Sequence, residues 1–497
     1  MNFTTIGEFR NYVNKKNITV IGIGISNLPL IKYLANAGAY VKACDKRTRE
    51  DLGNVYNELN ALGVSLCLGN DYLCDIQGDM IFKTPGMRYD VPELLKAKEM
   101  GAIITSEMEI FLDVCPCKII AITGSDGKTT TTTLISKMLI EQGYKTWLGG
   151  NIGTPLLTKT EDMSEEDFVV LELSSFQLHT MKKSPHIAVI TNISPNHLDM
   201  HKDYQEYIDA KKNIMLYQGN DDVLIVNADN DVTTQIGKEA KGTLKSFSRK
   251  DAAYVYCDGN VIYKNNSPVL NVGDIKIPGI HNVENYMAAI AAVDGLVDNE
   301  SIVNVAKTFG GVEHRIELVR ILNGVKYYNS SIDSSPNRTI NTLNVFPKKV
   351  ILISGGKDKG IPYDEIGEPI VNHVKTLILI GATSDKIEEA VKATLKADNL
   401  EIVRKSSYEE VVEYAHSIAK DGDVVLLSSA STSFDMFKNF EERGNLFKKL
   451  VNELYNSTSY HNLAKFVGKT RSHCIKSDIV VFPQIRCIAL YTTHSQR

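Results

Sequence analysis

The chain has 497 residues, too many for a single hydrophobic core, so its length predicts about three or four domains. It is 43% hydrophobic and 23% charged, as globular proteins are, and no apolar run approaches the length of a membrane-spanning helix. The formal net charge of −5 gives no support to a nucleic-acid partner. We therefore expect neither a nucleic-acid nor a membrane partner.

The N-terminus lacks the apolar core of a signal peptide. Eight cysteines are scattered through the chain, and the closest pair, Cys115 and Cys117, has no second pair at zinc spacing. We therefore expect a cytoplasmic protein with reduced thiols.

A β-α-β unit opens the chain. A G-x-G sequence ends the first predicted strand, residues 18–23, and an amphipathic helix leads to a second strand, residues 40–44. Asp45-Lys46-Arg47 follows that strand. This pattern suits a dinucleotide, but the third glycine of the fingerprint is replaced by Asn27. A phosphorylated or nucleotide-linked ligand fits the basic pair equally well.

The stretch that organises the chain is residues 118–135, which reads as a buried strand, a glycine loop and a helix. The loop, TGSDGKTT at 123–130, is typical of phosphate binding, because backbone N–H groups and a helix N-terminus surround the anion. Lys128 would reach the β- and γ-phosphates, and Thr129 could hold Mg²⁺. Ile122 stands where the standard P-loop has glycine, so an ordinary glycine-rich turn is the alternative.

Two more polar residues follow predicted strands. Glu172 is the one acid in the apolar run 168–173, where a carboxylate is costly unless it is paired, binds a cation or reaches solvent at the strand end. His197 lies in a polar loop after the strand 187–193. A histidine, an acid and a Lys-Thr loop at three strand ends predict a metal–phosphate site.

Two helices carry further candidates. The predicted helix 203–217 contains Lys211, which could equally belong to a solvated helix face. Asn282 and Asn285 are three residues apart near the start of an alanine-rich helix, so they share a face. That face could hydrogen-bond a nucleotide or cap the helix.

Predicted strands and helices alternate again in the rest of the chain. Residues 221–278 predict short strands and turns, with a loop at 265–268. Further predicted elements are the strands 350–353, 377–380 and 424–427 and a mostly helical segment, 434–454. From about residue 456 the sequence no longer shows this alternation of strands and helices.

The motifs together resemble the Mur ligase family of peptidoglycan synthesis, over about residues 18–455. In chain order they are TGSDGKTT, GGNIGTPL, ELSSFQL, TNISPNHLD, DAKKN, GIHNVEN, GVEHRIE and FKNFEERGN. The likeness is greatest to the members that add D-glutamate to UDP-N-acetylmuramoyl-L-alanine. It implies ATP-dependent amide formation through an acyl phosphate, two Mg²⁺ ions, and a role in cell shape and division.

The resemblance implies an α/β fold of three domains: an N-terminal Rossmann-like domain, a central P-loop ATPase with a mostly parallel sheet, and a C-terminal Rossmann-like domain. We place them at 1–114 for the UDP-substrate, 115–311 for ATP and 312–455 for the amino acid, with a tail of unknown role at 456–497. We expect a monomer.

The family's roles fall on particular residues of this sequence. Lys128, His197 and Lys211 match catalytic positions, and Lys211 matches a lysine that the family carbamylates. The matching metal ligands are Thr129, Glu172, His197 and Lys211. The matching ATP contacts are Gly124, Ser125, Asp126, Gly127, Lys128, Thr129, Thr130, Asn282, Asn285 and Arg315. The UDP-substrate contacts are Ser26, Asp45, Lys46, Arg47, Thr84 and Asn151, and the D-glutamate contacts are Ser334, Lys359, Ser433 and Phe440.

One segment departs from the family pattern, which often shows Asp-Ser-Lys-Ala-Thr after Asn329. Here Ser330 replaces the nucleotide-contacting acid and Ile332 replaces the lysine. Asp333 lies three positions later, so we do not expect it to compensate. Ser334 stands at the threonine position that contacts D-glutamate.

Other functions remain open at this point. A folylpolyglutamate synthase or another Mur ligase shares the central ATPase, although the folate enzyme's chain typically begins there. An NAD-dependent oxidoreductase would explain the G-x-G sequence but leaves Lys128, Glu172 and His197 without a role. A catalytically silent nucleotide-binding protein is kept open by Ser330.

Overall fold

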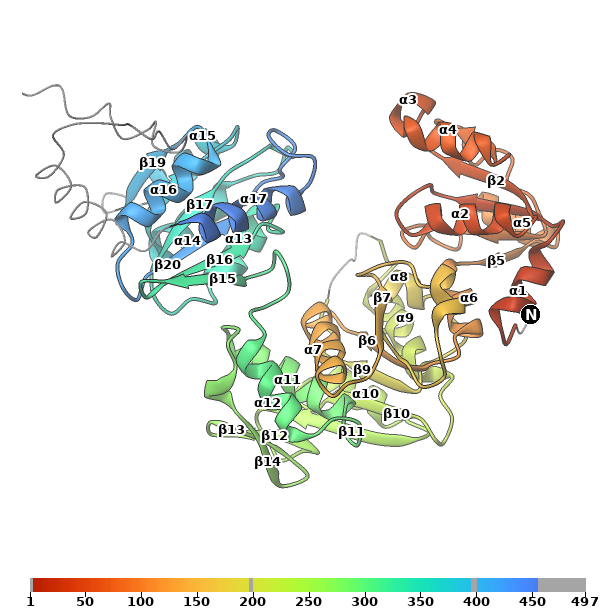
Figure 1. Cartoon of the computed structure of the whole chain (residues 1–497), viewed down its shortest axis with the longest axis horizontal. Coiled ribbons are helices and arrows are strands. Elements are labelled where there is room, and N and C mark those ends of the chain that lie inside the picture. Colours follow the sequence, from red (N-terminus) through yellow and green to blue (C-terminus); the bar gives the residue numbers. More distant parts are fainter. Residues whose placement is uncertain (1–2, 196–199, 395–399, 455–497) are drawn as a thin grey trace, which may run out of the picture. The chain divides into compact units, whose positions relative to one another are not determined.

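The computed structural model describes residues 3–195, 200–394 and 400–454. They form two compact units, Met1–Glu317 with Val345–Pro347, and Leu318–Asn344 with the chain from Lys348 onward. The first unit contains a five-stranded and a nine-stranded sheet, and the second contains a six-stranded sheet (Figure 1).

The five-stranded sheet has the order β3-β2-β1-β4-β5, and every neighbouring pair is parallel. Strand order reverses beside β1, which is where open α/β sheets bind ligands. Its strands are β1 (Asn17–Ile21), β2 (Tyr40–Asp45), β3 (Ser65–Leu68), β4 (Met80–Phe82) and β5 (Ile103–Thr105). Its helices are α1 (Ile6–Val13), α2 (Asn27–Asn36), α3 (Arg49–Leu52), α4 (Asn54–Ala61), α5 (Pro92–Glu99) and α6 (Glu107–Val114).

The nine-stranded sheet has the order β14-β13-β12-β11-β10-β9-β6-β8-β7. It is parallel from β7 to β12, and an antiparallel meander, β12-β13-β14, completes it. Its strands are β6 (Lys118–Thr123), β7 (Thr146–Gly150), β8 (Phe168–Glu172), β9 (Ile187–Ile190), β10 (Val223–Asn227), β11 (Thr243–Ser248), β12 (Val255–Asp258), β13 (Val261–Lys264) and β14 (Ser267–Asn271). Its helices are α7 (Lys128–Glu141), η1 (Leu157–Asp162), α8 (Ser175–Leu178), α9 (Tyr204–Leu216), α10 (Asp231–Gly237), η2 (Val272–Asp274), α11 (Ile280–Ala292) and α12 (Asn299–Thr308).

Strand β6 lies inside this sheet and has helices over both faces. Ile119 and Ala121 pack into one hydrophobic cluster, whereas Ile120 and Ile122 pack into another with α7 and α11. Because both faces are buried, the strand is a continuous apolar run. Its carboxyl end is thereby fixed where the glycine loop begins.

The six-stranded sheet has the order β15-β16-β20-β17-β18-β19, with parallel pairing from β16 to β19. Its strands are β15 (Glu317–Leu322), β16 (Val325–Ser330), β17 (Val350–Ser354), β18 (Val374–Leu379), β19 (Glu401–Arg404) and β20 (Val424–Ser428). Its helices are α13 (Pro336–Leu343), η3 (Asp364–Ile366), α14 (Gly367–His373), α15 (Ser384–Lys392), α16 (Tyr408–Ile418) and α17 (Phe440–Glu453).

The predicted fold of three mostly parallel α/β domains is confirmed, and two element assignments were wrong. Residues 265–268 were predicted as a loop, but Ser267 and Pro268 lie in β14, at the sheet edge, where proline is tolerated. The segment 221–278 also contains the helix α10. The segment 434–454 is mostly helical, as predicted, and its helix α17 begins at Phe440, after the N-cap Asn439. The residue bounds of the domains stay predictions.

Two other expectations concern composition. All six cysteines of the described residues are free thiols, in agreement with reduced cysteines. Among the described helices, none combines the length and apolar character that crossing a bilayer requires.

Glu107, in the first turn of α6, is a buried carboxylate that gives a first testable prediction. Leu157 N donates to its Oε1 (2.9 Å), yet burial dominates and raises the pKa to about 7 from an ordinary 4.5. The folded state therefore holds this proton more tightly than the unfolded state. The associated stabilisation is fully present below about pH 4.5 and is lost as the pH rises through about 7, with a total of roughly 3 kcal/mol.

We expect Glu107→Gln to flatten this part of the pH dependence. Unfolding midpoints of the wild type and the variant, measured from pH 5 to pH 8, should diverge in favour of the variant at the alkaline end. Glu99→Gln, on an exposed site of α5, is the control. Parallel curves for the wild type and Glu107→Gln would contradict the prediction.

Candidate active site

The glycine loop between β6 and α7 has the geometry of an anion-binding turn. Gly127 is left-handed, with φ +78°, and forms the N-cap of α7 without a side-chain capping bond. The first N–H groups of a helix have no acceptor within the helix, so they are available to an anion. The loop is also tight, because a Cβ on Gly124 would come within 1.9 Å of Thr191 Oγ1.

Bonds from the neighbouring strand end hold the loop in place. Ser125 N donates to Asn192 O (2.8 Å), and Asp126 N donates to Asn192 Oδ1 (2.9 Å). Ser125 Oγ lies 3.0 Å from Tyr207 Oη. These two predicted ATP residues thus use their N–H groups within the protein. The N–H groups of Lys128 to Thr130, in the first turn of α7, remain available to an anion.

Lys128 folds back over the loop. Its Nζ donates to Gly124 O (2.9 Å) and Ser125 O (2.8 Å). Burial lowers its pKa, against the opposing charges of Glu172 and Asp126. Arg315 is exposed, and its positive charge adds to this lowering of the Lys128 pKa. A phosphate between Lys128 and the helix start would replace these carbonyl contacts with a full ion pair.

Glu172, at the end of β8, is 2% exposed and is held by two neutral donors. Thr129 Oγ1 donates to its Oε2 (2.7 Å), and Asn151 Nδ2 donates to its Oε1 (2.9 Å). The solvent-exposed alternative for Glu172 is therefore wrong. A buried carboxylate beside a hydroxyl, with no ion pair within 4 Å in the described residues, fits a hard cation such as Mg²⁺.

Lys211 is also buried, so the alternative of a solvated helix face is wrong. Its Nζ donates to Gly124 O (2.8 Å) and Thr123 Oγ1 (3.4 Å), and it lies 4.7 Å from the centre of the Tyr207 ring. Burial lowers its pKa well below the ordinary value, and the charge of Lys128 adds to this. These effects favour the neutral amine of Lys211, which is a nucleophile, over the charged ammonium.

Asn282 and Asn285 do share a face of α11, and both are buried. Asn285 Nδ2 donates to Asn282 Oδ1 (2.9 Å), and Asn282 Nδ2 donates to Pro278 O (2.6 Å). Thr131 Oγ1 of α7 donates to Asn285 Oδ1 (3.3 Å). The pair therefore ties the start of α11 to the phosphate-loop helix, but it does not cap α11, whose N-cap Gly279 has no side-chain capping bond. Its nucleotide contacts stay a prediction.

The predicted UDP-substrate residues of the five-stranded sheet gather at the ends of β1, β2 and β4. Asp45 Oδ2 accepts from Ile23 N (2.7 Å), and Arg47 binds both Asp45 oxygens and Ile23 O. Burial raises the pKa of Asp45, but these bonds outweigh it and hold the pKa at about 2. The pair fixes the G-x-G turn, and Gly22 lies against Thr84.

Three other UDP-substrate candidates differ in position. Ser26 begins α2 and makes no capping bond, and Lys46 is exposed. Asn151 lies instead at Glu172, in the nine-stranded sheet. It therefore lies beside the phosphate loop, apart from Asp45 and Arg47, and its contact with the sugar-peptide end of the substrate stays a prediction.

In the second unit, the predicted D-glutamate residues follow β16, β17 and β20. Lys359 Nζ donates to Ser334 Oγ (3.4 Å). Ser433 is buried, and Phe440 O, at the start of α17, accepts from Ser331 Oγ (2.7 Å). The structure thus brings these residues into neighbouring loops at one edge of the sheet.

The segment that departs from the family pattern lies in the same region. Ser330, the last residue of β16, is buried. Asp333 turns into the domain interior, where Thr342 Oγ1 (2.7 Å) and Ser428 Oγ (2.8 Å) donate to its Oδ2. Burial raises its pKa. Its carboxylate is engaged inside the domain, in keeping with the expectation that it does not replace the missing acid.

Sequence reasoning missed Tyr207, which contacts both the phosphate loop and Lys211. A signal was present, because Tyr207 and Lys211 are four residues apart on α9 and must share a helix face. Asn192 was also missed as the residue that fixes the loop. His197, a predicted catalytic and metal residue, lies outside the described residues.

The described side chains do not form a metal site by themselves. In the part of the chain that the structure describes, no three His, Cys, Asp or Glu side chains are grouped to bind a metal. Mg²⁺ typically uses one or two carboxylates together with substrate phosphates and water. Thr129 and Glu172 could therefore supply the protein ligands of a Mg²⁺ site whose remaining ligands are substrate phosphates and water.

We predict that Gly127→Ala lowers kcat/KM for ATP by about ten-fold or more. Its Cβ would come 2.3 Å from Asn285 Oδ1, and left-handed backbone costs a residue with a Cβ about 1–2 kcal/mol. The matched control is Gly143→Ala at the other end of α7, which has φ +100° and open space around its Cβ. Equal ATP kinetics in the two variants would contradict the prediction.

Comparisons with known proteins agree with this geometry. Three family models match in chain order: the MurD-like N-terminal domain of Mur ligases at 16–106, the Mur ligase middle domain at 122–293, and the Mur ligase glutamate ligase domain at 314–431. Two solved structures share the fold at low identity. MurC from Thermotoga maritima has a TM-score of 0.54 and 19% identity, covering 87% of this chain and 98% of that one. MurF from Acinetobacter baumannii has a TM-score of 0.54 and 16% identity, covering 89% and 92%.

Curated relatives are far more similar. A UDP-N-acetylmuramoylalanine–D-glutamate ligase of Ruminiclostridium cellulolyticum is 58% identical over 458 residues, which is 90% of this chain and 98% of the relative. A protein of the same name from Acetivibrio thermocellus is 53% identical over 466 residues, covering 91% and 99%. The chain therefore belongs to the Mur ligase family, among relatives named UDP-N-acetylmuramoylalanine–D-glutamate ligases.

Proposed function

We propose that this protein joins D-glutamate to UDP-N-acetylmuramoyl-L-alanine at the expense of ATP, in peptidoglycan precursor synthesis. An oxygen of the L-alanyl carboxylate attacks the γ-phosphorus of ATP, and ADP leaves. The amine of D-glutamate then attacks the acyl phosphate, the C–O bond to phosphate breaks, and the amine loses a proton. The products are the amide, ADP and inorganic phosphate.

The described residues supply positioning and positive charge for the first step. The N–H groups of the first turn of α7 hold the phosphates, and Lys128 neutralises charge that develops on the transferred phosphoryl group. Thr129 and Glu172 would hold one Mg²⁺, which supplies further positive charge for the triphosphate when bound. We propose His197 as a ligand of a second ion.

Lys211 has the properties that a carbamate requires. A neutral buried amine can add carbon dioxide and lose a proton, which gives a carboxylate-like anion near Thr129 and Glu172. The low pKa and the position beside Gly124 support this proposal. A carbamate would also explain how a lysine can lie close to a bound cation.

The two organic substrates are assigned to the other sheets. We propose that the UDP-substrate lies at the switch point beside β1, held by Ser26, Asp45, Lys46, Arg47 and Thr84, with Asn151 at its sugar-peptide end. D-Glutamate is assigned to Ser334, Lys359, Ser433 and Phe440. Ser330 leaves the nucleotide without the family's acid at that position, so Arg315, Asn282 and Asn285 are the proposed remaining contacts. A cytoplasmic monomer is our working expectation.

The observation that carries the proposal is the grouping of Lys128, Thr129, Glu172 and Lys211 around one glycine loop in a chain 58% identical to a D-glutamate ligase. The test is phosphate release from ATP with UDP-N-acetylmuramoyl-L-alanine and a panel of D- and L-amino acids. Release and a new amide should require D-glutamate. Preference for another amino acid would point to a different Mur ligase, and activity only with a folate and L-glutamate would point to a folylpolyglutamate synthase.

A further inference from the structure

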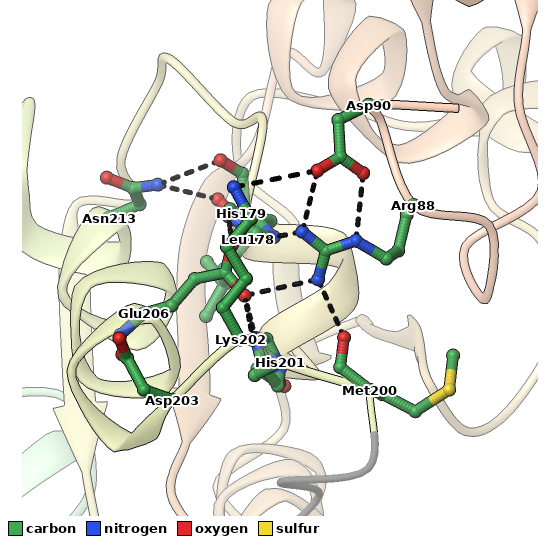
Figure 2. Close-up of polar contacts among 11 residues, drawn as sticks. Arg88, Asp90, Leu178, His179, Met200, His201, Lys202, Asp203, Glu206 and Asn213 are labelled. Atoms are coloured by element: carbon green, nitrogen blue, oxygen red, sulfur yellow. Dashed lines mark hydrogen bonds and ion pairs between the residues drawn. The ribbon is translucent and has the colours of Figure 1, made fainter. Parts of the chain in front are cut away.

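Arg88 forms the most extensive ion-pair network that joins the five-stranded sheet region to α9. It lies in the loop after β4, four residues beyond Thr84. Figure 2 shows its guanidinium between two carboxylates: Nε and Nη2 each donate to Asp90 (2.8 Å), and Nη1 and Nη2 each donate to Glu206 (3.1 Å). Nη1 also donates to Met200 O (2.7 Å).

Glu206 is built into the start of α9. Its own N–H donates to the N-cap Asp203 (2.8 Å), and its Oε2 accepts from Lys202 N (2.7 Å) (Figure 2). Hydrogen bonds from Arg88 are the main reason that its pKa is held at about 2, against the effect of burial. Arg88 therefore binds a side chain in the first turn of α9 and a backbone carbonyl of the segment that precedes the helix.

The same helix reaches the phosphate loop at the next residue and again little more than one turn later. Tyr207 follows Glu206 directly and contacts Ser125 Oγ (3.0 Å). Lys211 contacts Gly124 O (2.8 Å). Since a helix moves as a rigid element, a displacement of its first turn would displace both loop contacts.

His201 adds a second connection from this region. Its Nε2 lies 3.0 Å from Ser175 Oγ at the start of α8, which follows β8 and Glu172. Its Nδ1 lies 3.6 Å from Glu206 Oε2. Glu206, which Arg88 binds, thus lies close to His201, and His201 contacts the helix that follows Glu172.

We infer that Arg88 is a positioning residue that couples occupancy of the UDP-substrate site to the ATP site, through Glu206 and α9. The inference rests on the proposed function. Arg88 itself is assigned no contact with ATP or with the UDP-substrate. The loop of Arg88 carries Thr84, a proposed UDP-substrate contact, and α9 carries Tyr207 and Lys211, which contact the phosphate loop. Binding of the UDP-substrate should therefore favour the position of α9 that ATP binding requires, and binding of ATP should favour the position of the Arg88 loop that the UDP-substrate requires. The network is partly buried, with side-chain exposures of 24% for Arg88 and 14% for Glu206, so the melting temperature of each variant is measured beside its coupling.

The test is the dissociation constant of UDP-N-acetylmuramoyl-L-alanine, with and without a saturating non-hydrolysable ATP analogue. We expect the analogue to tighten binding to the wild type by about 5-fold or more, within the usual range of couplings between sites. In Arg88→Ala the ratio of the two dissociation constants, without and with the analogue, should fall close to one. The affinity for the analogue alone should change by less than about three-fold. Arg88→Lys and Glu206→Gln, which remove the two-point contact with less disturbance, should give intermediate ratios.

Two further variants sharpen the result. The double variant Arg88→Glu with Glu206→Arg should recover part of the coupling that each single change loses. Arg10→Ala removes another ion pair of the first unit, between α1 and Glu161 of η1, and should leave the ratio unchanged. A wild type without coupling would overturn the inference. So would an Arg88→Ala protein whose ratio is that of the wild type, whether or not its melting temperature has fallen. Product formation by the wild type in the same buffer reports the proposed function separately.

Discussion

Lys128→Ala is expected to lower kcat/KM for ATP-dependent ligation by about 10²- to 10³-fold, because removal of one preorganised transition-state contact typically costs this much. The ammonium is already held over the loop by Gly124 O and Ser125 O, so no rearrangement is needed when phosphate binds. The loss should appear mainly in kcat. The measurement is steady-state phosphate release over a range of ATP concentrations, with UDP-N-acetylmuramoyl-L-alanine and D-glutamate at saturation.

Stability provides the first control for this variant. Burial lowers the pKa of Lys128, so the folded protein does not favour the charged form of this side chain. Removing the side chain should therefore leave the melting temperature unchanged or slightly higher. Lys137→Ala, an exposed lysine on the same helix, should keep full activity. Undiminished turnover in Lys128→Ala, or inactivity that follows only from unfolding, would refute the assignment.

Lys211→Ala is expected to lower kcat by a similar factor, about 10² or more, and to recover activity when acetate or formate is added. The cavity left by the side chain lies beside Gly124 and Thr123, and a small carboxylate there would replace the proposed carbamate. Wild-type activity should in turn depend on bicarbonate. Intact-protein mass under native conditions should show a gain of one carbon dioxide that Lys211→Ala lacks.

The neighbouring Lys212→Ala is the matched control. Lys212 binds Glu239 (2.7 Å) on the outer side of the helix, so its loss should change kcat by less than two-fold, roughly the effect of an ordinary surface substitution. Rescue must be specific to Lys211→Ala. If carboxylates do not restore that variant and bicarbonate has no effect on the wild type, Lys211 acts as an amine and not as a carbamate.

The fold was largely predictable because each parallel sheet is buried on both faces. Strands such as β6 and β8 are continuous apolar runs that end in glycine or polar residues, and these ends are visible in the sequence. Prediction failed where the local pattern is ambiguous. Pro268 looks like a loop residue, and only the position of β14 at the sheet edge makes a strand possible there.

The site was predictable to the extent that its residues lie at the ends of parallel strands. Lys128 and Thr129 begin α7, directly after the loop that follows β6, and Glu172 ends β8. Because β6 pairs with β8, the sheet order brings these residues together. The contact between Asn151 and Glu172 was not predicted; it arises because β7 pairs with β8 and places their ends side by side. Strand order cannot be read from local sequence. The network around Arg88 was also hidden, since it depends on the packing of a loop against α9.

The central claim is that the carboxylate of UDP-N-acetylmuramoyl-L-alanine takes the γ-phosphoryl group of ATP at the loop of Lys128. The most direct measurement uses this substrate with heavy oxygen in the L-alanyl carboxylate and follows the label by mass spectrometry after ligation to D-glutamate. The account predicts that each phosphate released carries one labelled oxygen, because the acyl C–O bond is the one that breaks. Unlabelled phosphate with full product formation would contradict it.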